Sequence, residues 1–307
     1  MSNKPKIVVF GASKGGERFL RRCGNAYDVL AFSDNDPAKH GSSLSGIPVL
    51  PPDRIPDFPF DLVVVASMFG REIKDQLVRR FSIPPDRIRF APKSALSPDK
   101  SYRPFEDEPT RDLARRMLGH FADLFRNARI PYFVDHGTLL GIFRDGDLLP
   151  WDDDLDLSVP SEFAADALAA LRDARSSLPH AGVLDWSAET IADADSGLVQ
   201  GVVLCYPEQN PLRLRKFAAS VWFMFRSGDS IRQYINLAPA RFYDRPASLA
   251  FLGQNHPVPS PTSEYLELHY GDWKTPVRDL SLEEIRNYRP PPPRIRREVL
   301  FGTPSLS

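Results

Sequence analysis

The first ninety residues alternate between short apolar runs and stretches with helical spacing, and this alternation limits the fold more than any other feature of the chain. Lys6–Ala12 is a continuous apolar run ending in a glycine and an alanine, which is typical of a strand buried on both faces. Similar runs follow at Tyr27–Phe32 and Phe60–Ala66, and helical stretches are predicted at Glu17–Cys23 and Arg71–Phe81. Strands that alternate with helices over short connections form a parallel sheet covered by helices. An N-terminal α/β domain is therefore predicted over residues 1–91.

A glycine-rich loop, Gly11–Gly16, joins the first predicted strand to its helix. Such a loop can present N–H groups to a phosphate, and Asp34 lies where an acid can bind a ribose hydroxyl. Ser13, however, replaces the middle glycine of the dinucleotide fingerprint, and its side chain obstructs a pyrophosphate. The segments KIVVFGASKGG, FSDNDPAKHG, SGIPVL and DLVVVAS resemble the small Rossmann-like module attached to many bacterial sugar- and capsule-modifying enzymes. That resemblance implies a scaffold or oligomerisation role, with nucleotide binding as the less favoured alternative.

Composition excludes several classes of protein. The 307 residues carry 39 Lys+Arg against 40 Asp+Glu, without the basic excess of a duplex-nucleic-acid binder. Two cysteines, Cys23 and Cys205, exclude a disulfide scaffold and a four-cysteine metal site. The run Ile7–Ala12 is too short for a signal-peptide core or a membrane span. A cytoplasmic protein is predicted.

A second domain is predicted over residues 110–289. It follows a polar, proline-containing linker at residues 92–109 and begins with an amphipathic helix, Thr110–Ala128. Residues 290–307 form a proline- and arginine-rich tail, which we expect to be irregular. Five arginines and no acid fall within Arg286–Arg297, so an anionic membrane face is one expected contact, although a solvated tail is the simpler interpretation.

The chemistry is concentrated between residues 131 and 159. A short predicted strand leads into Asp135-His136-Gly137-Thr138, and Trp151 is followed by four acids in five positions. Asp154 and Asp156 are two residues apart, so on a strand both carboxylates point to one face and can converge on Mg²⁺ or Mn²⁺. The Gly-Thr turn and Arg144 could bind phosphate. An acidic run can also be a solvated loop, but these features together indicate metal-assisted phosphoryl transfer.

The segment DHGTLLGIFRDGDLLPWDDDLDLSV closely resembles the signature of the LicD/fukutin family, and FLGQNHPVPSPTSEYLELHYGDWKTP resembles the C-terminal segment of that family. The resemblance covers residues 110–280. It implies an α+β domain with a nucleotidyltransferase-like fold. It also implies transfer of a phospho-alcohol, such as phosphocholine or ribitol phosphate, from a CDP-activated donor to a glycan.

The same resemblance assigns roles to particular residues. Gly137 and Thr138 fall in the donor-phosphate turn, and Asp154 and Asp156 are the metal ligands. Asp153 and Asp135 are further acids that orient the acceptor hydroxyl or act as a base.

Four side chains outside these assignments are weaker candidates. His136, beside the glycine turn, could contact the donor phosphate, and Lys216 could meet the pyrophosphate from a basic cluster before a strand. Either could equally be packed or solvated. Tyr270 and Trp273 could close the donor pocket, although aromatic residues at a helix end more often pack.

One departure from the family bears on the metal site. Many relatives carry a third acid on a later strand, but the corresponding stretch here, Ser220–Phe225, contains none. Asp229 and Asp244 are the two substitutes that spacing leaves open.

Two alternatives to the predicted phosphotransferase remain. One is a non-catalytic nucleotide-binding or assembly subunit, favoured by the missing third acid. The other is a nucleotidyltransferase that uses a nucleoside triphosphate and releases pyrophosphate. Expected partners are the CDP-activated donor, a glycan or lipid-linked glycan acceptor, a second copy of the chain and, peripherally, the inner membrane face. Nucleic acid is not expected.

Overall fold

The computed structural model describes residues 4–67, 69–96, 103–278, 285–289, 291–292 and 294–303. Contacts divide the chain into unit 1, Met1–Ser101 with Asp279–Leu282, and unit 2, Tyr102–Arg278 with Glu283–Ser307. The division falls inside the predicted linker, of which residues 97–102 lie outside the described residues.

Unit 1 is a six-stranded sheet in the order β3-β4-β2-β1-β5-β6, parallel except for β3. Its strands are β1 (Lys6–Phe10), β2 (Asp28–Ser33), β3 (Ser43–Leu44), β4 (Ile47–Leu50), β5 (Leu62–Val65) and β6 (Ile88–Phe90). Its helices are α1 (Lys14–Cys23), α2 (Gly70–Phe81) and α3 (Lys93–Leu96). The predicted parallel α/β sheet is thus confirmed.

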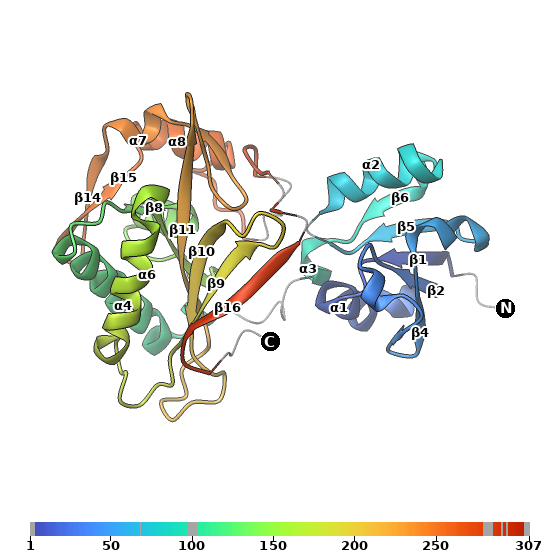
Figure 1. Ribbon diagram of the computed structural model, residues 1–307, viewed down its shortest axis with the longest axis horizontal. Coiled ribbons are helices and arrows are strands. Elements are labelled where there is room, and N and C mark those ends of the chain that lie inside the picture. The colour runs from blue at the N-terminus through green and yellow to red at the C-terminus, as the bar shows by residue number, and fades with distance from the viewer. Residues whose placement is uncertain are drawn as a thin grey trace. The chain divides into compact units, whose positions relative to one another are not determined.

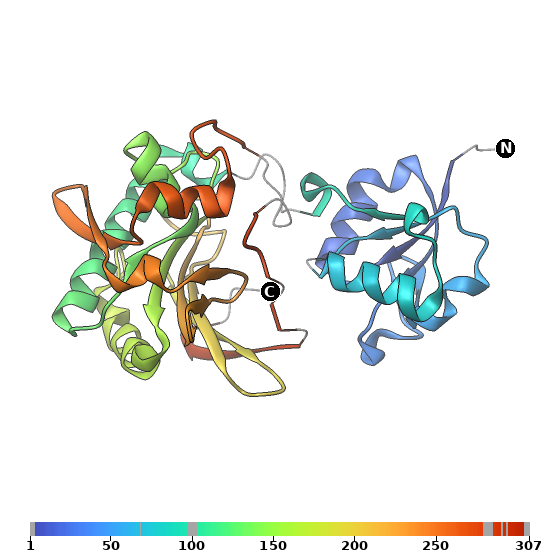
Figure 2. The ribbon, with the colours of Figure 1, turned by 90° about the horizontal axis from the view of Figure 1, so that it is seen from above.

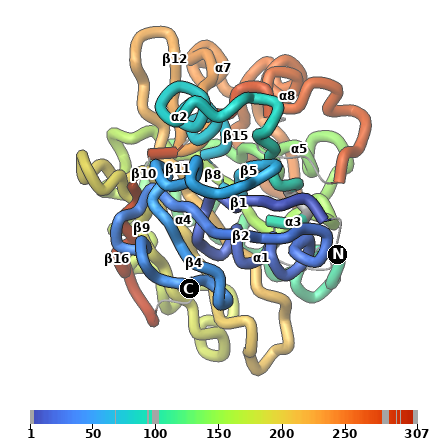
Figure 3. Tube along the Cα trace, turned by 90° about the vertical axis from the view of Figure 1, so that its right-hand side faces the viewer, coloured from blue at the N-terminus to red at the C-terminus, as the bar shows by residue number. Residues whose placement is uncertain are grey.

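The two faces of this sheet bury different helices. Ile7 and Val9 of β1 pack with Phe19 of α1, whereas Val8 and Phe10 pack in a second core with residues of α2. Figure 3 shows α2 and α1 on opposite sides of β1 and β5. Burial on both faces explains why β1 is an unbroken apolar run.

Unit 2 is built on an eight-stranded, mostly antiparallel sheet. Its strands are β7 (Phe133–Val134), β8 (Asp154–Pro160), β9 (Ser187–Asp193), β10 (Val199–Cys205), β11 (Ala218–Ser227), β12 (Ser230–Arg232), β13 (Leu237–Pro239) and β16 (Ile295–Phe301), with a separate hairpin of β14 (Ala247–Phe251) and β15 (Gln254–Val258). The helices are α4 (Glu108–Asn127), α5 (His136–Asp145), α6 (Ala164–Asp173), α7 (Arg241–Asp244) and α8 (Thr262–Tyr270). β8 runs between β7 and β11 and is parallel to β11.

One face of this sheet carries the core. Leu155, Leu157 and Val159 of β8 are fully buried beside Val221 and Phe223 of β11. Figure 1 shows α4 and α6 together beside the sheet, and Figure 2 shows α8 following directly on the β14–β15 hairpin. The alternating residues of β8, which include Asp154 and Asp156, therefore face away from this core.

The C-terminal segment corrects a prediction. Residues 290–307 were expected to be irregular, but Ile295–Phe301 form β16, which pairs antiparallel with β9. The sequence does not predict this strand, because it is rich in arginine and only its two ends are buried or partly buried, so no alternation of apolar residues marks it. Residues 290, 293 and 304–307 of the predicted tail lie outside the described residues.

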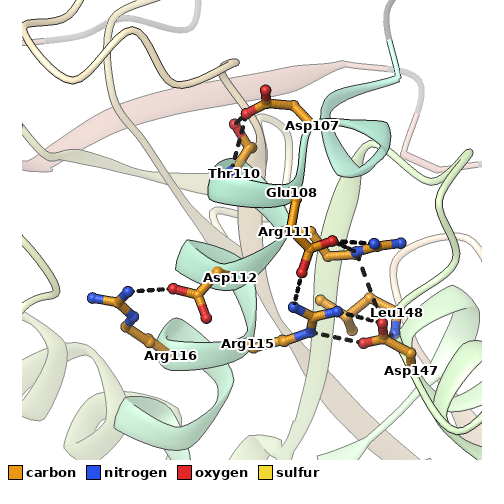
Figure 4. Close-up of polar contacts among 9 residues, drawn as sticks. All are labelled: Asp107, Glu108, Thr110, Arg111, Asp112, Arg115, Arg116, Asp147 and Leu148. Atoms are coloured by element: carbon orange, nitrogen blue, oxygen red, sulfur yellow. Dashed lines mark hydrogen bonds and ion pairs between the residues drawn. The ribbon is translucent and has the colours of Figure 1, made fainter.

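An ion-pair network fixes the loop between α5 and β8 to the start of α4 (Figure 4). Asp107 caps α4 by accepting the backbone N–H of Thr110 at 3.1 Å. Arg115, on the second turn of the same helix, donates to Asp147 in a bidentate pair, with 2.9 Å from Nε to Oδ1, and also binds Glu108. The pairing raises the pKa of Arg115, opposed only by partial burial. The loop that leads to the acidic run is thereby anchored.

Candidate functional site

Helix α5 begins beside β8, and Asp135 sets its start. Asp135 has an extended backbone and accepts the N–H of His136 at 2.9 Å, as an N-cap residue does. Its own N–H binds the carbonyl of Asp156 at 3.3 Å. The first turn of α5, with Gly137 and Thr138, is thus held at the edge of the acid-bearing strand.

The side chain of Asp135 lies in a buried polar network. Its carboxylate is fully buried and accepts hydrogen bonds from Ser158 at 2.7 Å, Gln233 at 2.9 Å and Tyr265 at 2.5 Å. Burial alone would raise the pKa of Asp135, but the neighbouring His136 and these hydrogen bonds outweigh burial and lower that pKa. In this structure the carboxylate is enclosed, and it caps the helix.

Three consecutive acids converge next to the same helix end. Asp152, Asp153 and Asp154 each place a carboxylate oxygen within 4.8 Å of the others. A Cβ on Gly137 would lie 2.2 Å from Oδ2 of Asp152, so only glycine allows this carboxylate to approach the first turn of α5. Clustered carboxylates repel one another, and oxygen ligands at such spacing suit Mg²⁺ or Mn²⁺. The donor set therefore fits the predicted cation, with Asp152 as a member that sequence reasoning did not single out.

Asp156 lies on the same face of β8 as Asp154 and is 8% exposed. Its Oδ1 accepts the indole N–H of Trp222 at 2.9 Å, and its backbone N–H donates to Oγ1 of Thr138 at 2.9 Å. Burial raises the pKa of Asp156, and the charges of Asp135 and Asp153 act in the same direction. A bound cation would favour the ionised form of such a carboxylate. Thr138, expected in a phosphate turn, joins α5 to β8 through its hydroxyl.

Arg144 has other partners than the phosphate expected for it. Its guanidinium pairs with Asp145 at 2.8 Å, donates to the carbonyl of Trp273 at 3.2 Å and lies 5.6 Å from the ring of Trp151. The side chain is only 8% exposed. These contacts join the end of α5 to Trp151, just before the acids, and to Trp273.

His136 and His269 lie close to each other and to Asp135. His136 has a positive φ of 51°, its Nδ1 lies 3.4 Å from Nδ2 of Asn236, and the two imidazole rings are 5.6 Å apart. Nε2 of His269 lies 3.0 Å from Nδ2 of Asn287, and burial lowers the pKa of His269 to about 3. His136 therefore sits at the site, 13% exposed, on a strained backbone that the surrounding polar groups maintain.

Neither expected substitute for the third acid is close. β11 begins at Ala218, opposite Asp154, and its ten residues extend about 30 Å before the turn that contains Asp229. Asp244 pairs with Arg226 at 2.6 Å, near that far end. Lys216, by contrast, precedes β11 by two residues and so lies at the same end of the sheet as the acids.

Of the two interpretations offered for Tyr270 and Trp273, closing a pocket or packing, the contacts agree with packing. Tyr270 is partly buried and packs against the core of unit 2; desolvation raises its pKa well above the ordinary value, and the charges of Asp152 and Asp156 add to the effect. Trp273 packs against Phe143, with ring centroids 5.5 Å apart. Both aromatic residues thus pack against the core of unit 2.

The glycine loop of unit 1 is internally satisfied. Oδ2 of Asp34 accepts the N–H of Ala12 at 2.8 Å and pairs with Lys39 at 2.9 Å, while Oδ1 accepts the N–H of Asp36 at 3.0 Å. A Cβ on Gly16 would lie 2.0 Å from the carbonyl oxygen of Gly11, so the loop is closely packed. The acid that could bind a ribose is already bonded to its own loop.

Within the part of the chain that the structure describes, no helix combines the length and apolar character needed to cross a bilayer.

Comparison with known proteins supports the sequence resemblance. Residues 129–260 match the family model "LicD/FKTN/FKRP, nucleotidyltransferase domain", and residues 3–89 match "C2185-like, N-terminal". Ribitol-5-phosphate transferase FKTN of Homo sapiens is 25% identical over 171 residues, which cover 55% of this chain and 34% of that protein. The protein of the same name from Macaca fascicularis is 24% identical over the same length. The chain spans about a third of the length of these curated relatives.

Similarity to solved structures is weak. The antibiotic-resistance factor ANT(2'')-Ia has a TM-score of 0.35 at 11% identity, covering 57% of this chain and 80% of its own. UDP-D-quinovosamine 4-dehydrogenase from Vibrio fischeri has a TM-score of 0.25 at 19% identity, covering 29% and 79%. Neither similarity is strong enough to bear on the fold. Residues 129–260 thus match the nucleotidyltransferase domain of the LicD/FKTN/FKRP family, and the similarity to the two curated relatives supports this match.

Proposed function

We propose that unit 2 is a metal-dependent phosphotransferase that moves a phospho-alcohol from a CDP-activated donor to a glycan acceptor. The observation that carries the proposal is the convergence of Asp152, Asp153 and Asp154 at the first turn of α5, with Asp156 on the same face of β8. Family membership supports the class of reaction, and the clustered carboxylates support a divalent cation, Mg²⁺ or Mn²⁺.

The residues divide into three tasks. Asp154 and Asp156 would hold the cation together with Asp152, which Gly137 admits to the helix end. When bound, the cation would neutralise charge on the donor pyrophosphate. Lys216, at the same end of the sheet, would add positive charge beside the phosphates.

In the reaction, an acceptor hydroxyl oxygen forms a bond to the β-phosphorus of the donor. The bond from that phosphorus to the bridging oxygen breaks, and CMP leaves with the electron pair. Asp153 is exposed, whereas Asp135 is enclosed, so Asp153 is the acid to which we assign the hydroxyl proton.

A donor panel tests the proposal. The full chain is incubated with CDP-choline, CDP-ribitol and related donors, with glycan acceptors, and with or without Mg²⁺, and released CMP is quantified. Metal-dependent CMP release with at least one donor supports the assignment. Binding without release across the panel would favour a nucleotide-binding subunit, and pyrophosphate release from a nucleoside triphosphate would favour a nucleotidyltransferase.

For unit 1 we propose a scaffold or oligomerisation role. Its glycine loop and Asp34 are hydrogen-bonded to each other, which leaves the loop poorly suited to a redox dinucleotide. Removing unit 1 should change the mass measured by light scattering or lower stability. An unchanged mass and stability would contradict this role.

A further inference from the structure

Asp156 is held from the neighbouring strand by a single indole. Trp222 lies on β11, two residues beyond Ser220, which is the direct partner of Asp156 in the parallel register. Its Nε1–H donates to Oδ1 of Asp156 at 2.9 Å, although the two residues are 66 positions apart in sequence. A hydrogen bond to one oxygen restricts the rotation of a carboxylate and so defines where its other oxygen lies.

The indole itself is fixed on both sides. Gly201 of β10 lies opposite Trp222, and a Cβ on Gly201 would be 2.6 Å from Cε3 of the indole. Tyr234 stacks on Trp222, with ring centroids 4.8 Å apart and planes inclined by 2°. A glycine beneath the ring and an aromatic ring stacked on it therefore hold the N–H in one orientation.

β11 carries no acid that could share the acidic face, since its ten residues are AASVWFMFRS. We propose that Trp222 is a positioning residue for Asp156: it holds Oδ1 so that Oδ2 serves as a cation ligand. This inference rests on the proposed function, because it assumes that the acids bind a cation. Groups that orient a metal ligand typically contribute 10- to 100-fold to metal affinity.

The test measures Mn²⁺ affinity of the full chain from the electron paramagnetic resonance signal of free Mn²⁺, which needs no donor or acceptor. Trp222→Phe keeps an aromatic ring and removes the N–H, and should weaken Mn²⁺ binding about tenfold. The matched control is Trp186→Phe. Trp186 is buried and donates its indole N–H to the carbonyl of Pro179 at 2.8 Å, so this variant loses a comparable bond in the core. It should bind Mn²⁺ as the unchanged protein does.

A double-mutant cycle identifies the residue through which Trp222 acts. In an Asp156→Asn background, Trp222→Phe should weaken Mn²⁺ binding no further, because the carboxylate that the indole orients is gone. Should Trp222→Phe fail to fold, as judged by circular dichroism, the pair Tyr234→Ala and Tyr234→Phe replaces it. Loss of the stacked ring should then weaken binding, and loss of the hydroxyl alone should not.

Three results would overturn the inference. They are unchanged Mn²⁺ affinity in Trp222→Phe, or in Tyr234→Ala where that pair is used, an equal loss in Trp186→Phe, and full additivity with Asp156→Asn. These results leave the proposed transfer standing if the unchanged protein binds Mn²⁺. Absence of Mn²⁺ binding by the unchanged protein would instead overturn both the cation site and this inference.

Discussion

Unit 1 and unit 2 each bring an aspartate close to a glycine at the start of a helix, but the surroundings of the two carboxylates differ. Asp34 in unit 1 accepts two backbone N–H groups and the ammonium of Lys39. Asp152 in unit 2 lies against Gly137 and within 4.8 Å of two further carboxylates. An acid surrounded by donors stabilises its own loop, whereas acids crowded on one another favour a cation. Asp152 also accepts the backbone N–H of Asp153 at 3.2 Å, so the difference from Asp34 lies in the neighbouring carboxylates, which support the proposed cation site.

The largest expected effect is on activity, and it should distinguish Asp154 of unit 2 from Asp34 of unit 1. Asp154→Asn should reduce metal-dependent CMP release about 10³-fold, since it removes several kcal/mol of charge stabilisation, with little change in the unfolding temperature. Asp34→Asn, the matched change in unit 1, should leave turnover unchanged. Near-normal turnover in Asp154→Asn would contradict the proposed cation site in unit 2.

Asp34→Ala should instead affect stability. Loss of hydrogen bonds to a charged group should lower the free energy of unfolding of unit 1 by about 2–3 kcal/mol. All four tryptophans, Trp151, Trp186, Trp222 and Trp273, lie in unit 2, so tryptophan fluorescence follows that unit alone. Circular dichroism should reveal an earlier transition that fluorescence lacks. NAD(P) should not shift it, and tight NAD(P) binding that Gly11→Val abolishes would contradict the scaffold role.

The two units should also differ in their response to acid. His269 has a pKa of about 3 in the folded state because it is buried, against 6.5 as its ordinary value. Below pH 6.5 His269 binds a proton in the unfolded chain but stays neutral in the folded chain. The free energy of unfolding therefore falls as pH falls from 6.5 towards 3, by about 2 kcal/mol at pH 5. His269→Gln should flatten this dependence in fluorescence-detected urea unfolding. An equally steep loss in the variant would show that His269 is not the cause.

The smallest effect concerns Gly137. In Gly137→Ala the new Cβ would meet Asp152, so Mn²⁺ affinity should fall about tenfold while the fold persists. Gly119→Ala is the control, because a Cβ at that position in α4 has its nearest neighbour at 3.8 Å. Equal Mn²⁺ affinity in both variants would show that the acids do not depend on the bare helix turn.

Local patterns were sufficient for the elements whose burial repeats along the chain. The apolar run of β1, the helical spacing of α2 and α4, and the shared face of Asp154 and Asp156 could all be predicted, because side-chain periodicity depends only on the local backbone. The same reasoning missed β9 and β16. These two strands pair with each other across about a hundred positions of sequence, and no local pattern reports such a contact.

The partners of the site residues were decided by tertiary structure. The sequence by itself determined that a run of acids follows Trp151 and that a glycine turn precedes it, and so indicated the chemistry. It could not show that Asp152 would lie against Gly137, that Arg144 would bind Asp145 and the carbonyl of Trp273, or that Trp222 would hold Asp156. Each of these contacts depends on where distant segments meet. Hydrogen bonds and charge pairs act over a few ångströms of space whatever the separation in sequence, so only the folded chain decides which acids are enclosed and which lie close to other carboxylates.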